Sequence, residues 1–462
     1  MAVKKLYYNT QNCIRINNVY TRWFPSFYGV RQGDSLSPTL FSIFLNDLAN
    51  SIKYEKLGID IGTKNIGILL YADDVALIAE DEEKLQKEID ILKDWCIPWK
   101  LNVNLAKSQV VHFRRTRRKR TNFIFTFGDK LLELVPKYRY LGVIFDENLN
   151  FNECATTLAN SAGRALSSVI SKFSPLKNIM FSTYTKLYDT TVWPILNYCS
   201  SVWGYKKHQY ATKIQNRACR YFLGVHKNAP DLAVQGEMGW ELIESKYYLS
   251  MFRLWNKLIK LDRTRITRCI FEWDLQNFNS DSWCGKIWNV FDLLNLQEVF
   301  ENGEEVNLSH IRSKLDIIMQ NIWCEKLAYK PKLRTYVHIK DTLETEPFLK
   351  SSISKFQRSL LTQLRIGILP LAVETGRYYR IALENRTCQI CSENLVEDVV
   401  HFVCNCNAYA SVREKFFPRF MSYFNVNEMD SYDKSCNILN VDNVRLQCET
   451  STILNGNVEK SL

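Results

Sequence analysis

The sequence has little glycine and proline, 17 and 11 residues among 462. Because these residues break regular structure, their scarcity excludes long flexible linkers and favours helices. No apolar run reaches the roughly 18 residues of a transmembrane helix, so we expect no membrane partner. The opening residues, MAVKKLYYNTQN, lack the apolar core of a secretory signal. We therefore expect a protein that is not secreted and works inside the cell, in the nucleus, the cytoplasm or both.

The length and composition are those of a folded chain of several domains. At roughly 150 residues per domain, the length predicts about three domains. Hydrophobic residues make up 46% of the chain and charged residues 24%, which is ordinary for globular proteins. The formal net charge of +11 suits a polyanionic partner or a membrane surface. Composition leaves the location of this charge and the oligomeric state open.

The cysteines are spread along the chain except in one place. There are 14 of them, and Cys388, Cys391, Cys404 and Cys406 crowd into one short segment. Without a secretory signal we expect reduced thiols, and a tight cluster then favours metal binding over disulfides.

Apolar spacing predicts the elements of the first 150 residues. Ser37 is a candidate N-cap and Pro38 a first helical residue, before apolar residues that recur at helical spacing as far as Ile52. Residues 67–80, GILLYADDVALIAE, predict a strand, an acidic turn and a second strand. A second helix is expected to start among the acids 80–83 and to end at Pro98; its buried stripe comprises Leu85, Ile89, Leu92 and Cys96. Short strands are expected within 109–113, 123–127 and 138–145.

From about residue 154 the pattern is helical. The segments ANSAGRALSSVISKF and KIQNRACRYFLGV are amphipathic and basic, and residues 240–365 predict further helices. The end of the chain is rich in asparagine, which favours neither helix nor strand, so we expect partial disorder there; these residues are Asn425, Asn427, Asn437, Asn440, Asn443, Asn455 and Asn457.

Asp73 and Asp74 lie between the two apolar arms of the predicted hairpin. Adjacent carboxylates repel, so this pair is a poor choice for stability. One explanation is an ordinary turn, since aspartate is a common turn residue. The other is a divalent metal site, because carboxylate oxygens bind Mg²⁺ and two such ions assist phosphoryl transfer.

Several motifs in order carry a family resemblance. YADD (71–74) resembles the catalytic hairpin of reverse transcriptases. RQGDSLSPTLFSIFLNDL (31–48), NLAKSQVV (104–111) and YRYLGVIFD (138–146) resemble the neighbouring blocks of LINE-type, non-LTR retrotransposon reverse transcriptases, the last being the primer grip. The helical stretch 158–240, with SSVWGYKK and RYFLGVHKNAP, resembles their thumb. Together these segments cover about half of the chain.

The resemblance implies an RNA-directed DNA polymerase that adds deoxynucleotides to a DNA primer on an RNA template. Asp73 would bind Mg²⁺ or Mn²⁺, with Asp74 in a lesser role. Lys107 would lie near the triphosphate and act on the leaving pyrophosphate; a solvated surface lysine is the alternative. Arg31, Gln32 and Gly33 would lie along the template or the incoming nucleotide.

One expected group is missing from this sequence. Two-metal polymerase chemistry needs a further aspartate, which in this family precedes the RQG block, yet residues 1–33 contain no acid and Asp34 is the first. We therefore expect an N-terminally truncated reverse transcriptase without polymerase activity of its own. The alternatives are a non-catalytic nucleic-acid-binding remnant that uses the thumb, a basic loop and a zinc module, or a product that never folds.

Two further segments are candidate binding sites. Six cations between residues 114 and 120 predict a loop that either contacts phosphates or directs nuclear import; they are Arg114, Arg115, Arg117, Arg118, Lys119 and Arg120. Cys388 and Cys391 form a CxxC knuckle, and His401 with a later cysteine completes a tetrahedral Zn²⁺ shell. Free buried cysteines are the alternative.

Spacing alone leaves the fourth zinc ligand open between Cys404 and Cys406. The segment 365–409 resembles the C-terminal zinc module of these elements, whose pattern favours Cys406 followed by Tyr409, with Cys404 as the alternate. On this resemblance Arg365, Arg377 and Arg386 would lie on or near the module and contact RNA.

The predicted fold is α+β. A partial polymerase palm, an antiparallel sheet with flanking helices that includes the primer grip, spans 1–150. It is followed by a helical thumb (151–240), a helical C-terminal region (241–370), a small CCHC zinc module (371–412) and an Asn-rich tail (413–462).

Overall fold

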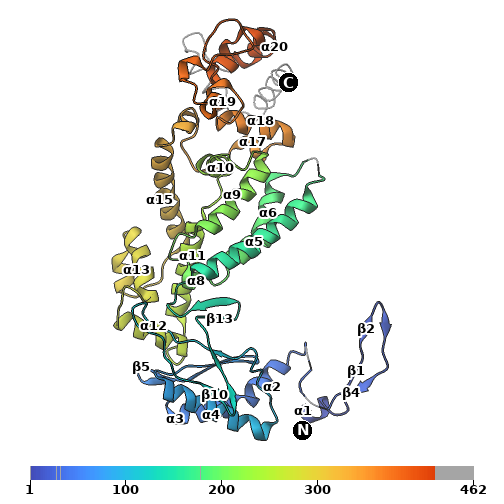
Figure 1. Ribbon diagram of the computed structural model, residues 1–462, viewed down its shortest axis with the longest axis vertical. Coiled ribbons are helices and arrows are strands. Elements are labelled where there is room, and N and C mark those ends of the chain that lie inside the picture. Colours follow the sequence, from blue (N-terminus) through green and yellow to red (C-terminus); the bar gives the residue numbers. More distant parts are fainter. Residues whose placement is uncertain (1, 28, 32, 177, 422–462) are drawn as a thin grey trace. The chain divides into compact units, whose positions relative to one another are not determined.

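The computed structural model describes residues 2–27, 29–31, 33–176 and 178–421 (Figure 1). Gln32 and the asparagines of the predicted tail lie outside these residues. The chain divides into two compact units, 1–138 and 139–462. The boundary therefore lies before the predicted one at residue 150. Residues 413–421, which we had placed in the tail, belong to a helix, α20 (Ala410–Met421).

The first unit opens with short elements. Helix α1 (Ala2–Leu6) is followed by two antiparallel pairs, β1 (Gln11–Asn12) with β4 (Phe24–Pro25) and β2 (Arg15–Ile16) with β3 (Val19–Tyr20). All eight residues of these strands are exposed. Strands of two residues form few ladder hydrogen bonds, so this segment contributes little to the core of the unit.

The helix predicted after Ser37-Pro38 is present but divided. It comprises α2 (Ser37–Phe44) and α3 (Asn46–Glu55), which meet at Leu45. The predicted N-cap was wrong, because the cap is Leu36. The Ser37 hydroxyl instead donates a hydrogen bond to the Arg31 carbonyl at 2.6 Å, and Asp34 Oδ1 accepts from the Leu36 amide.

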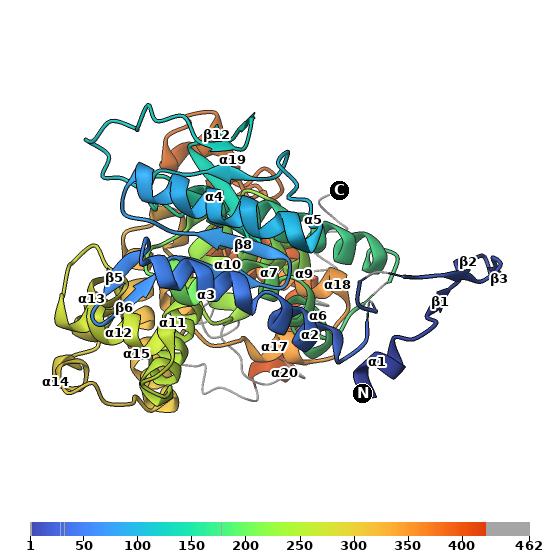
Figure 2. The ribbon, with the colours of Figure 1, turned by 90° about the horizontal axis from the view of Figure 1, so that it is seen from below.

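The predicted hairpin is confirmed as β7 (Ile68–Tyr71) paired with β8 (Asp74–Leu77). It packs against α3 and α4 (Glu82–Trp99), and Figure 2 shows β8 running beside α4. Asp81 caps α4 by accepting a hydrogen bond from the Lys84 amide at 2.8 Å. Pro98 does not end this helix as predicted, because the backbone turns left-handed only at Lys100.

The remaining strands of this part of the chain pair only two at a time. The antiparallel pairs are β5 (Ile59–Ile61) with β6 (Lys64–Ile66) and β10 (Thr126–Phe127) with β11 (Lys130–Leu131). β9 (Gln109–Val110) pairs in parallel with β12 (Glu133–Leu134), and β13 (Lys137–Tyr140) pairs with β14 (Val143–Asp146). Mixed helix and strand content is therefore confirmed. A wider palm sheet is not found among the described residues, since most of these strands are too short to extend one.

The second unit is helical from α5 onward, as predicted from about residue 154. Its first helices are α5 (Asn152–Phe173), α6 (Phe181–Thr191), α7 (Trp193–Leu196), α8 (Ser200–Trp203), α9 (Gln209–Leu223) and α10 (Asp231–Met238). Figure 1 shows α5 and α9 side by side, and these two helices are in direct contact. The Tyr184 hydroxyl donates to the Ala218 carbonyl at 2.8 Å and so fixes α6 against α9.

The later helices pack on the same unit. They are α11 (Ile243–Lys260), α12 (Ile266–Gln276), α13 (Trp283–Leu293), α14 (Gln297–Glu301), α15 (Leu308–Ala328), α16 (Tyr336–Ile339), α17 (Pro347–Lys350), α18 (Lys355–Arg365) and α19 (Ala372–Tyr378). Short helical turns η1 (Pro331–Leu333), η2 (Leu383–Asn385), η3 (His401–Asn405) and η4 (Asn407–Tyr409) connect them. None of the described helices is both long and apolar enough to cross a membrane.

One core joins segments that we had predicted as separate domains. It runs from Ala155 on α5 through Trp240 and Trp323 to Cys406 and Tyr409. A second core, centred on Trp255 and Phe291, lies among α11 to α15. The predicted thumb, C-terminal region and zinc module are therefore parts of one compact unit.

Candidate nucleic-acid and metal sites

The tip of the β7–β8 hairpin carries the two aspartates. Tyr71 pairs with Asp74, so Ala72 and Asp73 form the turn and Asp74 begins β8. Ala72 has a φ of 51°, the left-handed backbone that two-residue hairpin turns require. Both aspartates are exposed. The acidic break predicted between the strands is thus one turn residue and one strand residue.

Lys107, Arg31 and Gly33, the other described residues predicted for this site, each have local surroundings of their own. The described residues contain a single group of three or more potential metal ligands, and it is not at the hairpin. Lys107 is exposed and its carbonyl accepts a hydrogen bond from the Tyr138 hydroxyl at 2.9 Å. Arg31 lies over the Tyr7 ring at 5.4 Å. Gly33 has a φ of 85° and open space where a side chain would stand.

Sequence reasoning missed a buried acid beneath the hairpin. Glu88 on α4 has no exposed surface, and neither carboxylate oxygen has a hydrogen-bond partner among the described residues. Burial raises the pKa of Glu88 to about 8. The sequence did offer one indication of this burial, because Glu88 directly precedes Ile89 and lies within the predicted apolar stripe. Glu88 packs against Gly67, where an added Cβ would stand 2.3 Å from Oε1.

The six cations of residues 114–120 occupy a loop between β9 and β10, as predicted. Arg114 is half-buried and its guanidinium donates to the carbonyls of Thr116 and Arg118. It thus closes the loop. Arg115, Arg117, Arg118 and Lys119 are exposed, and Arg120 is half-buried. The loop therefore presents most of its charge to solvent.

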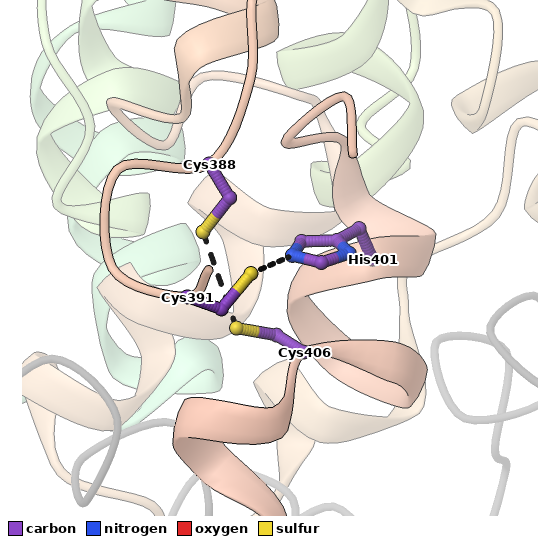
Figure 3. A group of neighbouring side chains, drawn as sticks. All are labelled: Cys388, Cys391, His401 and Cys406. Atoms are coloured by element: carbon purple, nitrogen blue, oxygen red, sulfur yellow. Dashed lines mark hydrogen bonds between the residues drawn. The ribbon is translucent and has the colours of Figure 1, made fainter. Parts of the chain in front are cut away.

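The C-terminal Cys/His residues converge. The Cys388, Cys391 and Cys406 thiols and one His401 ring nitrogen lie within 4.8 Å of one another (Figure 3). Cys388 Sγ is 4.0 Å from Cys406 Sγ, and Cys391 Sγ is 3.4 Å from His401 Nε2. Cys404 is half-buried and is not in this group. Of the two alternatives, the structure thus brings Cys406 to the other three residues.

Backbone geometry holds these four side chains in place. An isolated bridge between Thr387 and Val396 and the hydrogen bond from the Cys388 amide to the Leu395 carbonyl close the CxxC loop. The Cys406 amide donates to the His401 carbonyl at 2.7 Å across the turn η3. The two halves therefore face each other, as Figure 3 shows.

The donor set and its spacing suit a soft, tetrahedral cation. A Zn–S bond of about 2.3 Å in a tetrahedron separates two sulfurs by roughly 3.8 Å, close to the observed Cys388–Cys406 separation. Burial raises the pKa of both thiols, that of Cys406 to about 12. The residues present therefore fit Zn²⁺, which binds thiolates and would displace these protons.

One arginine predicted to contact RNA is buried. Arg365 is 1% exposed and pairs with Glu237 at 3.0 Å and with Glu346 at 2.8 Å. The prediction that it contacts RNA was therefore wrong, because its guanidinium group forms ion pairs in the interior of the unit. Arg386 donates to the carbonyls of Val373 and Ile381, and exposed Arg377 pairs with Glu374.

Comparison with known proteins places the first unit in a family. Residues 2–145 match the family described as reverse transcriptase (RNA-dependent DNA polymerase). This segment includes the hairpin, Lys107, the basic loop and the β13–β14 pair.

Curated relatives extend the match. An RNA-directed DNA polymerase from mobile element jockey of Drosophila funebris is 29% identical over 193 residues, 40% of this chain and 20% of that protein. A Pol polyprotein from a type-1 R2 retrotransposable element of Nasonia vitripennis is 27% identical over 30% of this chain and 14% of its own length. Another, from a type-1 R1 element of the same wasp, is 22% identical over 83% of this chain and 86% of its own.

The coverage limits how much of these relatives the chain represents, since it spans about a fifth of the jockey protein's length. The match nevertheless coincides with the motifs and with the observed hairpin. Residues 2–145 carry a reverse transcriptase domain, and the chain is similar to proteins of the jockey, R2 and R1 mobile elements, which are non-LTR retrotransposons.

Proposed function

We propose that this chain binds nucleic acid as part of the reverse-transcription machinery of a non-LTR retrotransposon. Its family implies an RNA template, a DNA primer and deoxynucleotides as substrates. The hairpin that exposes Asp73 and Asp74, the residues Gly33 and Lys107, and the basic loop all lie in the matched segment and support this function.

We further propose that this 462-residue polypeptide does not extend primers by itself. The observation that carries the proposal is the absence of a third carboxylate beside Asp73 and Asp74 among the described residues. Two adjacent carboxylates on one turn do not fit a complete two-metal site, which needs a ligand facing them from another element. The chain would then act as a nucleic-acid-binding protein.

Primer extension tests this proposal. The purified chain is incubated with an RNA template, a DNA primer, deoxynucleotides and either Mg²⁺ or Mn²⁺, while binding of the same duplex is measured in parallel. We expect binding without extension. The control variant is Asp94→Ala, which removes an exposed acid of α4. The proposal would be refuted by template-dependent extension that Asp73→Ala abolishes and Asp94→Ala does not change.

We propose that Cys388, Cys391, His401 and Cys406 hold a structural Zn²⁺. The metal would tie the CxxC loop to the His401–Cys406 turn and supply folding energy rather than chemistry, because four protein ligands leave no open position. Mass measurement under native conditions should find one zinc per chain. Cys388→Ser and Cys406→Ser should lose it. Cys404→Ser is the matched control and should retain it; retention in Cys406→Ser would contradict the ligand set.

We propose that the basic loop contacts phosphates. Exposed arginines release counterions when they bind nucleic acid, so each lost contact reduces the dependence of affinity on salt. Replacing Arg115, Arg117 and Arg118 by Ala should lower the slope of log affinity against log salt by about 2 on single-stranded RNA. An unchanged slope, with altered nuclear import of a fluorescent fusion, would favour the localisation role instead.

A further inference from the structure

A basic cavity in the second unit has no assigned role. It has a volume of about 740 Å³ and lies where α9, α10, the start of α11 and the end of α15 meet the segment 329–333. Helix α10 contacts both α9 and α15 (Figure 1). A volume in this range accommodates a nucleotide-sized ligand.

The charge of the lining is strongly one-sided. Five lysines line the cavity, together with only two acids, Asp231 and Glu244. Both acids are already paired, Asp231 with Arg220 and Glu244 with Lys207 at 2.7 Å. Within the described part of the chain, no ion pair involves the other four lysines of the lining, which are Lys213, Lys326, Lys330 and Lys332.

These four lysines gather positive charge around one concave surface, where Lys213, Lys326 and Lys330 are exposed and Lys332 is half-buried. Like charges around one concave surface repel each other, and the low-dielectric walls concentrate their positive potential. Lys213 relieves part of this by lying 5.2 Å from the Tyr210 ring. An anion bound in the cavity would remove the repulsion among all four lysines at once. The charge of the lining therefore suits a phosphate ligand.

The rest of the lining suits a nucleobase. Gln209 offers an exposed amide group that can both donate and accept hydrogen bonds, whereas the Gln215 and Gln235 amides already donate to the Glu241 carbonyl and to Asn216 Oδ1. Apolar walls come from residues such as Leu242, Met319 and Leu333. Tyr329, at the end of α15, is 85% exposed and leaves its ring face available for stacking.

We propose that this cavity binds an unpaired nucleotide of a single nucleic-acid strand. The four lysines would neutralise its phosphates, and Tyr329 would stack on a base. A single strand is favoured over a duplex because paired, stacked bases cannot present a face to Tyr329. The inference rests on the proposed nucleic-acid-binding function and adds a site in the second unit, separate from the hairpin and from the basic loop.

Binding measurements on the full chain test the site. The probe is a labelled single-stranded RNA of about 12 nucleotides, with its duplex form as a second probe. The cavity variant is Lys213→Ala with Lys330→Ala. The charge-matched control is Lys257→Ala with Lys260→Ala, two exposed lysines of α11 outside the cavity.

We expect the cavity variant to bind single-stranded RNA at least tenfold more weakly. The slope of log affinity against log salt should fall by about 1.4, because each of the two lost phosphate contacts contributes about 0.7. The control should change affinity less than threefold. Tyr329→Ala should weaken single-strand binding by on the order of tenfold and leave duplex binding unchanged. Circular dichroism of each variant verifies that it folds.

Photocrosslinking of unmodified protein with 4-thiouridine RNA provides a test that needs no variant, and crosslinks should map to peptides of α9 or 322–333. The cavity site would be overturned if the cavity and control variants lost equal affinity for RNA, or if crosslinks mapped only to residues 1–138. Either result would leave the proposed function intact. If micromolar free nucleotide displaces the RNA, the ligand of the cavity is a free nucleotide, and the proposal of a single strand is wrong. A wild-type chain that binds no RNA would instead refute the proposed function.

Discussion

Among single residues, Glu88 gives the stability of the first unit a dependence on pH. Its carboxyl group is buried without a hydrogen-bond partner among the described residues, and its pKa lies near 8 instead of 4.5. Between these values the unfolded chain releases this proton while the folded chain keeps it. Stability is therefore fully present below pH 4.5 and falls as the pH rises, by about 1.4 kcal/mol per unit until the pH reaches the folded pKa.

We predict that Glu88→Gln removes this dependence, because glutamine fills the same volume without a charge. Limited proteolysis with mass spectrometry across a urea series measures unfolding of the segment 46–99. Wild type should lose about 2 to 3 kcal/mol between pH 5 and pH 7, and the variant should lose much less. Glu83→Gln, an exposed acid on the same helix, should behave as wild type; an equally flat Glu83→Gln profile would exclude Glu88 as the source.

Arg365 is the corresponding case in the second unit. Its ion pairs with Glu237 and Glu346 lie in the core, so its removal leaves the buried Glu237 carboxylate without its cation and leaves Glu346 paired with Lys340. We predict that Arg365→Ala destabilises the unit by about 3 to 5 kcal/mol. Arg377→Ala removes an exposed arginine whose partner, Glu374, also pairs with Arg334, so it should cost less than about 1 kcal/mol. Thermal unfolding compares the two, and similar melting temperatures would contradict the buried network.

At the scale of elements, the end of α10 depends on a glycine. Gly239 has a φ of 55°, and an added Cβ would stand 2.0 Å from the Thr345 amide nitrogen. The backbone there cannot yield easily, because the Glu346 amide donates to the Glu237 carbonyl at 3.1 Å. This glycine therefore permits the close approach of the segment before α17 to α10.

We predict that Gly239→Ala costs about 2 to 4 kcal/mol, from both the backbone conformation and the clash. Gly303→Ala is the matched control, since Gly303 has a φ of 64° with open space around it and should cost about 1 kcal/mol. Urea unfolding of the second unit measures both. Equal costs would show that the left-handed backbone alone, and not the approach of Thr345, sets the effect.

Elements with local signals were predictable from the sequence, and those set by distant contacts were not. The β7–β8 hairpin followed from two apolar arms around an acidic turn, and α4 from acids before an apolar stripe. The break at Leu45 and the cap at Leu36 depend on contacts of Ser37 and Asp34 that no periodicity encodes. The β-rich runs of the sequence likewise did not predict that the short strands pair only two at a time.

The candidate sites divide in the same way. The Cys/His group could be predicted because all its members lie within 19 residues, although spacing alone left Cys404 and Cys406 open. The basic loop was evident from composition. Glu88, the burial of Arg365 and the lysine cavity each require residues far apart in sequence, such as Lys213 and Lys330, to meet. Such contacts leave no trace in spacing.

On the scale of the whole molecule, the proposed zinc site is coupled to the helices of the second unit. Cys388 and Cys406 belong to the same core as Tyr184, Phe222 and Leu364, which lie on α6, α9 and α18. Phe402 and Tyr409, on either side of the Cys406 turn, contact each other edge to face at 5.4 Å within that core. Loss of the metal therefore removes a constraint on packing well beyond residues 388–406.

We predict that chelation lowers the thermal stability of the second unit and leaves the first unit unchanged. Without a cation the four donors, three of them buried, would rearrange and weaken the core that they line. Hydrogen exchange after treatment with a zinc chelator should lose protection in 371–409 first and then in α18, while α4 keeps its protection. Cys388→Ser should reproduce this pattern without chelator, and Cys404→Ser should resemble untreated wild type. Protection that stays intact in α18 after complete zinc removal would mean that the module unfolds alone, despite the core that it shares.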